Sequence, residues 1–432
     1  MKWEDQLDYA GASDVGMRRS NNQDSYRILT APNVQQWRSR GHLFMVADGM
    51  GAHAVGELAS KMAVDTVPHT YHKLANLECN EAITKAVQDA NSLIYNRGTA
   101  NKDFQGMGTT STVLLLLPEG ALIAHVGDSR AYRLRDGVIE QLSFDHSLAW
   151  ELVRRRQLTM EQARTMVPNN VITRSLGPEP AVQVDVEGPH DVRPGDVFLL
   201  CSDGLSGMVG DAELGALAGS LSAKDACQYL VDLANLNGGA DNITLVVVRV
   251  PAPPDAGKSG AIAKQPSPPR NYSTLLMILG LVSLVGCLIL GIMGRLLLDE
   301  FRAAGRNALV GAALEGLVLL LAGVVWRFLA RPTVILPPTP QANPLRPPTP
   351  CALDKPLLTR FGARLQQLRD FAVKHAWNVD WTEFFAHRTA GDKAIESGDL
   401  LAAASEFCQA QRLLAIGQKR HREATQSLLD VK

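Results

Sequence analysis

Five short runs of apolar residues constrain the fold of this chain more than any other feature of its sequence. They cover residues 42–47, 111–117, 121–126, 196–201 and 243–250. Runs that are apolar at nearly every position are typical of strands buried on both faces. The turn signals Pro118-Glu119-Gly120 and Arg135-Asp136-Gly137 lie between such runs, as they do in β-hairpins. The sequence therefore predicts antiparallel sheets.

Helical patterns over residues 57–72 and 80–97 lie between the strand runs. Together these elements indicate one mixed α/β (α+β) domain over residues 8–250, in which helices flank the sheets.

The composition argues against some classes of function. Lys and Arg number 43 and Asp and Glu number 44, which gives a net charge of −1, and no basic stripe favours a nucleic-acid partner. The six cysteines are scattered without a C-x-x-C pair, which argues against a zinc knuckle and suits a reducing compartment. The N-terminal residues lack the apolar core of a signal peptide, so we expect this domain in the cytoplasm.

Two apolar stretches, residues 273–298 and 308–330, follow a Pro-rich linker over residues 251–272. The first has about 20 apolar residues before Arg295, enough to cross a bilayer. The second contains Glu315, which costs a few kcal/mol inside a membrane unless it has a partner. We expect a transmembrane hairpin, with a buried core helix as the alternative for the first stretch. Basic residues are more frequent outside the pair than between its members, which places both long ends in the cytoplasm at the inner (plasma) membrane.

A second Pro-rich linker, residues 331–352, leads to a helical segment over residues 353–432. Five residues there have the spacing of one tetratricopeptide unit, in which small residues let two helices approach closely: Gly391, Gly398, Ala403, Phe407 and Ala410. The large residues usual before Gly391 are missing, so a generic helical hairpin is the alternative. Either arrangement could bind a protein partner.

An Asp beside Gly or Asn, or close to one, recurs where strand runs end or turns begin. The five cases are Asp24, Asp48, Asp128, Asp203 and Asp241. A carboxylate directly after a buried strand has a rigid base and an accessible head, and a neighbouring Gly leaves room for a ligand. Such carboxylates suit Mg²⁺ or Mn²⁺, which prefer oxygen ligands. A single Asp-Gly is weak evidence, and we expect Asp136-Gly137 to be only a hairpin turn.

The ordered set of motifs resembles the metal-dependent protein phosphatases, the type 2C Ser/Thr family, and most of all their bacterial branch. The resemblance covers residues 8–250. Its motifs are Ser13-Asp14-Val15-Gly16, residues 19–24, residues 46–51, Gly108-Thr109-Thr110, residues 125–132, Asp145-His146-Ser147, residues 200–205 and Asp241-Asn242-Ile243-Thr244. It implies a four-layer α-β-β-α sandwich with a two-metal centre at one edge.

The resemblance also implies roles for single residues. Asp48 would bridge two Mn²⁺ or Mg²⁺ ions, and the carbonyl of Gly49 would bind one of them. Asp203 and Asp241 would hold the other ion. Asp24 would act through metal-bound water.

Three further assignments come from the same resemblance. Arg19 would grip the substrate phosphate with its planar guanidinium. Asp128, with Asp203, matches a third, weaker ion site. Residues 145–176 match a flap over the site. A hydroxide bridging the two ions would attack phosphorus in line, so Cys201 is expected to pack rather than to react.

The chain departs from the family pattern at a few positions. Gln23 stands where the family usually has Glu, next to metal-bound water. Ala52 replaces a common Gly. Met50 occupies the place of a His proposed as general acid in animal enzymes, which leaves water or His53 to protonate the leaving oxygen.

The leading hypothesis is a membrane-tethered phosphatase that dephosphorylates phosphoserine and phosphothreonine on proteins. It would oppose a bacterial Ser/Thr kinase, with that kinase and its protein substrates as partners. The alternative is a membrane-anchored binding or sensor protein with a weakened or inactive phosphatase fold, for which Gln23 is the supporting residue. A third hypothesis gives the C-terminal helices the main role, as a partner-binding module.

Overall fold

The computed structural model describes residues 7–51, 55–168, 171–251 and 347–430. The predicted hairpin over residues 273–330 lies outside these ranges, as do Ala52 and His53. Within the described ranges, no helix has both the length and the apolar character that a membrane crossing requires.

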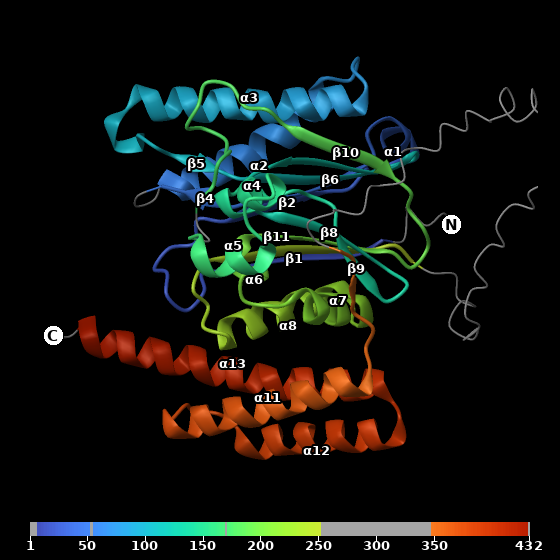
Figure 1. Cartoon of the computed structure of the whole chain (residues 1–432), viewed down its shortest axis with the longest axis vertical. Coiled ribbons are helices and arrows are strands. Elements are labelled where there is room, and N and C mark those ends of the chain that lie inside the picture. The colour runs from blue at the N-terminus through green and yellow to red at the C-terminus, as the bar shows by residue number, and fades with distance from the viewer. Residues whose placement is uncertain (1–6, 52–54, 169–170, 252–346, 431–432) are drawn as a thin grey trace, which may run out of the picture. The chain divides into compact units, whose positions relative to one another are not determined.

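Two antiparallel sheets form the centre of the fold (Figure 1). The first sheet has the order β1 (Asp8–Asp14), β12 (Ile243–Arg249), β11 (Val197–Cys201), β8 (Arg130–Arg135), β9 (Val138–Gln141) and β13 (Thr349–Pro350). The second has the order β10 (Asp185–His190), β7 (Gly120–Val126), β6 (Ser111–Leu117), β3 (His42–Ala47) and β2 (Ser25–Leu29). A small ribbon pairs β4 (Gly49–Met50) with β5 (Gly108–Thr109). Each of the five apolar runs became a strand, because each is buried on both faces.

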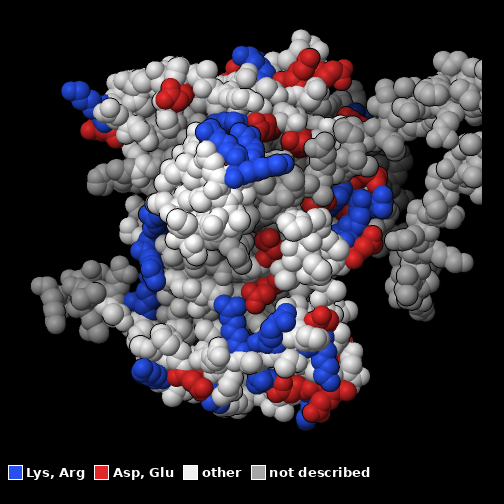
Figure 2. All heavy atoms as spheres, in the orientation of Figure 1, with Lys and Arg blue, Asp and Glu red and all other residues white. Residues whose placement is uncertain are grey.

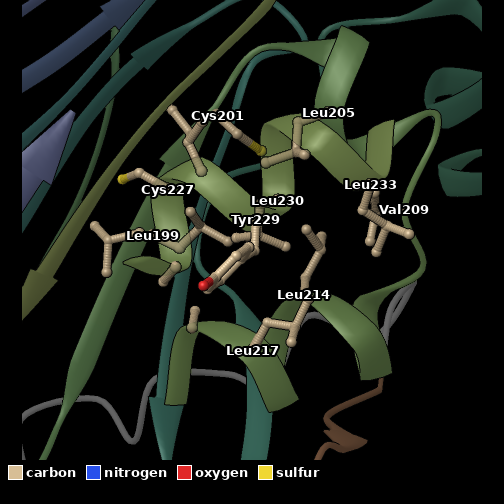
Figure 3. Close-up of a cluster of buried hydrophobic side chains, with 14 of the residues drawn as sticks. Leu199, Cys201, Leu205, Val209, Leu214, Leu217, Cys227, Tyr229, Leu230 and Leu233 are labelled. Atoms are coloured by element: carbon tan, nitrogen blue, oxygen red, sulfur yellow. The ribbon is translucent and has the colours of Figure 1, made fainter. Parts of the chain in front are cut away.

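The sheets stack face to face over a core that includes Phe44, Leu114, Phe198 and Val246. The helices α2 (Val55–Lys73) and α3 (Cys79–Ala100) cover the outer face of the five-stranded sheet. The helices α7 (Asp211–Ser220) and α8 (Ala223–Leu236) cover the other sheet. Figure 3 shows Leu199 and Cys201 of β11 in one apolar cluster with Leu214 of α7 and Leu230 of α8. The predicted four-layer α-β-β-α sandwich is confirmed.

Shorter helices connect these layers. They are α1 (Val34–Arg40), the 3₁₀ turn η2 (Lys102–Phe104), α4 (Leu148–Arg154), α5 (Met160–Met166) and α6 (Asp203–Ser206). Asp136 and Gly137 join β8 to β9 with φ angles of 52° and 73°. Two successive positive φ angles are the signature of a type I′ hairpin turn, so Asp136-Gly137 is a turn, as predicted.

The C-terminal segment consists of α11 (Lys355–Lys374), α12 (Trp381–Ser397) and α13 (Leu400–Asp430). It belongs to the same compact unit as the sandwich, with α13 packed against α8. The predicted linker over residues 331–352 is wrong in its last residues, because Thr349 and Pro350 pair with β9 and the Cys351 N–H donates to the Gly137 carbonyl at 2.8 Å. A proline is tolerated at this sheet edge, where its missing N–H costs no ladder bond.

The predicted close approach of two helices occurs between α12 and α13. A Cβ atom at Gly391 would lie 2.3 Å from the Phe407 ring, so only glycine fits there. Phe361 of α11 meets the same ring edge-on at 6.1 Å. This is a helical hairpin completed by a third helix and by α8, and the tetratricopeptide assignment stays a prediction. Acidic and basic side chains are mixed over the exposed surface of these helices (Figure 2).

Candidate metal centre

The five predicted aspartates come together at one edge of the sandwich. Asp24 precedes β2 and Asp48 follows β3 in one sheet, while Asp203 follows β11 and Asp241 lies just before β12 in the other. Asp128 follows β7. The other four aspartates all lie near enough to Asp48 to repel its negative charge. The loops of both sheets therefore converge on a single acidic site.

The site strongly disfavours so many negative charges without a cation. Burial, followed by repulsion from the other carboxylates, raises the pKa of Asp48 well above its ordinary value. Burial also raises the pKa of Asp24 to about 7 and that of Asp128 to about 8. The pKa of Asp203 is raised by burial and by Asp241. A divalent cation would offset this repulsion.

Oxygen atoms suited to a hard cation are present. Oδ1 of Asp24 and Oδ1 of Asp128 are buried, and within the described parts of the chain neither has a hydrogen-bond partner. In those same parts, no group of three or more His, Cys, Asp or Glu side chains is placed to hold a metal ion by itself. Mg²⁺ is commonly held by one or two carboxylates and keeps several waters. The residues therefore fit ions whose shells are completed by water and by a carbonyl such as that of Gly49.

Two threonines fix the backbone of Asp48. The Asp48 N–H donates to Oγ1 of Thr110 at 2.8 Å, and Oγ1 of Thr109 donates to the Asp48 carbonyl at 2.9 Å. The neighbouring Gly49 pairs with Thr109 in the small ribbon. These bonds orient Asp48 and Gly49 from a buried base.

Ser202 is a functional residue that sequence reasoning missed. Its hydroxyl donates to Oδ2 of Asp24 at 2.8 Å and accepts from the Thr244 N–H at 3.0 Å. It thereby ties Asp24 of one loop to β12 of the opposite sheet. Its place directly before Asp203 was the available signal.

Asn242 is the second missed residue. Its side-chain amide donates to the carbonyls of Val15 and Asn21, both at 2.9 Å. Its side-chain oxygen accepts from the Gln23 N–H at 2.8 Å. One buried side chain therefore holds both ends of the loop that carries Arg19.

Arg19 lies beside one of the carboxylates. Its guanidinium donates to Oδ2 of Asp241 at 2.7 Å, with side-chain exposures of 54% and 36%. An ion pair this exposed contributes little to stability. The guanidinium can therefore exchange Asp241 for a phosphate group at small cost.

The predicted flap begins at a firmly held base. Arg130 makes a bidentate pair with Asp145, in which Nε donates to Oδ1 at 3.1 Å and Nη2 donates to Oδ2 at 2.6 Å. Nε2 of His146 lies 2.8 Å from Asp185.

A cleft of about 440 Å³ lies between α4 and α6 and is lined in part by Asp128 and Asp203. It offers room for a substrate segment beside the carboxylates.

Cys201 is fully buried on β11. Burial raises the pKa of its thiol to about 12. A thiol held protonated at neutral pH is a poor nucleophile, in agreement with the predicted packing role.

Residues 17–237 match a family model described as protein phosphatase 2C. The chain belongs to this family. It is 38% identical over 240 residues to a putative protein phosphatase 2C-type of Streptococcus pyogenes serotype M6, a match that covers 55% of this chain and 94% of that protein. It is 36% identical over 245 residues to the protein phosphatase PhpP of Streptococcus pneumoniae, with 55% and 94% covered.

Solved structures agree with this assignment. The Mycobacterium tuberculosis serine/threonine phosphatase PstP/Ppp is 33% identical, with a TM-score of 0.51 over 57% of this chain and 99% of that one. The Streptococcus agalactiae serine/threonine phosphatase is 34% identical, with a TM-score of 0.51 over 56% and 99%. This 2C-type chain is a protein-serine/threonine phosphatase of the bacterial kind.

Proposed function

We propose that this phosphatase hydrolyses phosphoserine and phosphothreonine on proteins with two Mn²⁺ or Mg²⁺ ions. Asp48, Asp203, Asp241 and the carbonyl of Gly49 would hold the ions. The observation that carries the proposal is the convergence of five carboxylates, each supplied by a different loop, on one buried edge where burial and repulsion act on Asp48.

When bound, the ions would supply a water activated for in-line attack and would neutralise phosphoryl charge. Arg19 would bind the phosphoryl oxygens of the substrate. Asp24, oriented by Ser202 at 2.8 Å, would accept a hydrogen bond from the attacking water. Asp128 and Asp203 would hold a third, weaker ion.

Hydrolysis of p-nitrophenyl phosphate by the full chain tests this proposal. Turnover should require Mn²⁺ or Mg²⁺, and Asp48→Asn should reduce kcat by at least about 100-fold, because an ion in such a centre contributes several kcal/mol. Asp136→Asn is the matched control, since Asp136 belongs to a hairpin turn whose geometry also suits Asn. A wild-type chain without metal-dependent turnover would instead support the binding or sensor alternative.

The proposal also places the enzyme at a membrane, opposing a Ser/Thr kinase. The feature that supports the membrane tether is the pair of apolar stretches over residues 273–298 and 308–330. Membrane fractionation of cells that express the full chain tests the tether. Recovery of the chain in the supernatant without detergent would contradict it.

A further inference from the structure

The long helix α13 reaches the loop that carries Arg19. The guanidinium of Arg422 donates to the carbonyl of Gly16, and its Nη2 donates to the carbonyl of Arg19 at 2.8 Å. Arg422 and Arg19 are 403 positions apart in sequence. The family match ends at residue 237, so α13 lies outside the matched domain.

This loop, residues 15–24, joins β1 to β2 and has no ladder partner of its own. The sandwich holds part of it, because the Met17 N–H and the Arg18 N–H both donate to the Gly239 carbonyl, at 2.8 and 3.2 Å. Those bonds fix N–H groups. Arg422 instead donates to the carbonyl groups of the residues on either side, Gly16 and Arg19. The two sets of bonds therefore restrain different groups of the same loop.

A second contact from α13 supports the same region. Nζ of Lys419 lies 3.9 Å from Asp14, whose Oδ1 accepts from the Gly16 N–H at 2.9 Å. Lys419 is one turn before Arg422 on the helix, so both side chains project toward the same loop.

The helix itself is firmly docked on α8. Nε2 of Gln411 donates to the Tyr229 carbonyl at 2.9 Å, and Nε2 of Gln418 donates to the Asn235 carbonyl at 3.2 Å. Cys408 is buried in the same apolar cluster as α8. Arg422 therefore projects from a fixed support onto the middle of a loop whose two ends are held by Asn242.

We propose that Arg422 is a positioning residue for the phosphatase reaction: by binding the carbonyls of Gly16 and Arg19, it holds the loop so that the Arg19 guanidinium meets the substrate phosphate. The inference rests on the phosphate-binding role proposed above for Arg19. Because the loop is already ordered before the substrate binds, binding does not have to include the loss of the loop's conformational entropy. The C-terminal helices are thereby part of the substrate-binding apparatus.

The test compares Arg422→Ala with Arg420→Ala in the full chain at saturating Mn²⁺. Arg420 is exposed on the same helix, and its replacement by Ala removes one positive charge, as Arg422→Ala does. With p-nitrophenyl phosphate, Arg422→Ala should raise KM by about fivefold, and the inhibition constant of inorganic phosphate should rise in parallel. The kcat should stay within about twofold. Arg420→Ala should match the wild type, and Arg422→Lys should recover part of the loss.

A double-mutant cycle separates positioning from a general effect on folding. In an Arg19→Ala background, Arg422→Ala should change KM no further, because the residue acts through Arg19. A lower melting temperature with unchanged KM, or the same KM increase in both backgrounds, would overturn the proposal. A wild-type chain without turnover would refute the proposed function, whereas an active wild type with an unaffected Arg422→Ala variant would refute only the positioning role.

Discussion

At the scale of single residues, the site depends on small polar side chains that join distant segments. Asn242 bonds Val15, Asn21 and Gln23 at 2.8 to 2.9 Å, and Ser202 bonds Asp24 at 2.8 Å. The carboxylates supply charge, but these neutral groups set where the charge lies. A buried polar group with all its bonds made is rigid, so the loop around Arg19 starts from a defined position.

Gln23 gives a prediction at this scale. Its backbone N–H donates to the Asn242 side chain at 2.8 Å, and Asp24 follows it in the chain, so Gln23→Glu adds a negative charge next to the site. We expect the Mn²⁺ concentration for half-maximal activity to fall by about threefold to tenfold, because a higher ligand charge raises affinity for a divalent ion. The control is Gln35→Glu on the exposed face of α1. An unchanged Mn²⁺ requirement would show that Gln23 lies outside the influence of the ions.

The sequence predicted the carboxylates but not their supports, for a physical reason. An Asp at the end of an apolar run is visible in a local pattern, and all five such residues do converge. Ser202 and Asn242 act across separations of 178 and 219 or more positions. Their partners are brought near only when the two sheets stack, so their places beside Asp203 and Asp241 could mark them as part of the site but could not show which groups they bond.

At the scale of elements, α8 is packed on both sides, against the sheet and against α13. Asp232 of α8 lies in this second contact, near Arg412 and Lys419 of α13 and near Asp14. Its Oδ1 accepts from Gln228 at 3.1 Å, while Oδ2 is buried without a partner within the described residues. Burial raises the pKa of Asp232 to about 6.

The raised pKa gives a prediction about stability. Folding favours protonated Asp232, so its contribution is fully present below about pH 4 and is lost as pH rises through about 6. Asp232→Asn should therefore raise the free energy of unfolding at pH 8 by up to about 3 kcal/mol, with no gain at pH 4. Urea unfolding at both pH values measures this, with Asp65→Asn on the exposed face of α2 as the control. Equal effects at both pH values would contradict the account.

The contact between α12 and α13 gives a second prediction for an element. Gly391→Ala would place a methyl group 2.3 Å from the buried Phe407 ring, and overpacking of this kind costs about 1 to 3 kcal/mol. The matched control is Gly219→Ala on α7, where the nearest atom would lie at 3.6 Å and helix propensity favours Ala by up to about 1 kcal/mol. Thermal unfolding should show a lower melting temperature for the first variant and an equal or higher one for the second.

Most strands and long helices could be read from the sequence because their burial is encoded locally. The edge strand β13 could not. Thr349 and Pro350 lie in a Pro-rich stretch with linker composition, and their pairing with β9 depends on the docking of the helices that follow. The packing of α13 on α8 was missed for the same reason.

At the scale of the whole molecule, two parts of the chain that flank residues 254–341 form one compact unit. The sandwich supplies the carboxylates and Arg19. Helix α13 supplies Arg422, which binds the loop that carries Arg19. Structure and catalysis in this enzyme are therefore expected to depend on both ends of the chain.

If the five carboxylates form a metal centre, the chain binds divalent ions that can be counted directly. Calorimetric titration of the full chain with Mn²⁺ at pH 7.5 should show at least two ions per wild-type chain and fewer in Asp48→Asn, while Asp136→Asn binds as the wild type does. Asp48 is decisive because all four of the other carboxylates act on it. A wild-type chain that binds no Mn²⁺, or an Asp48→Asn variant that binds it equally well, would contradict the account.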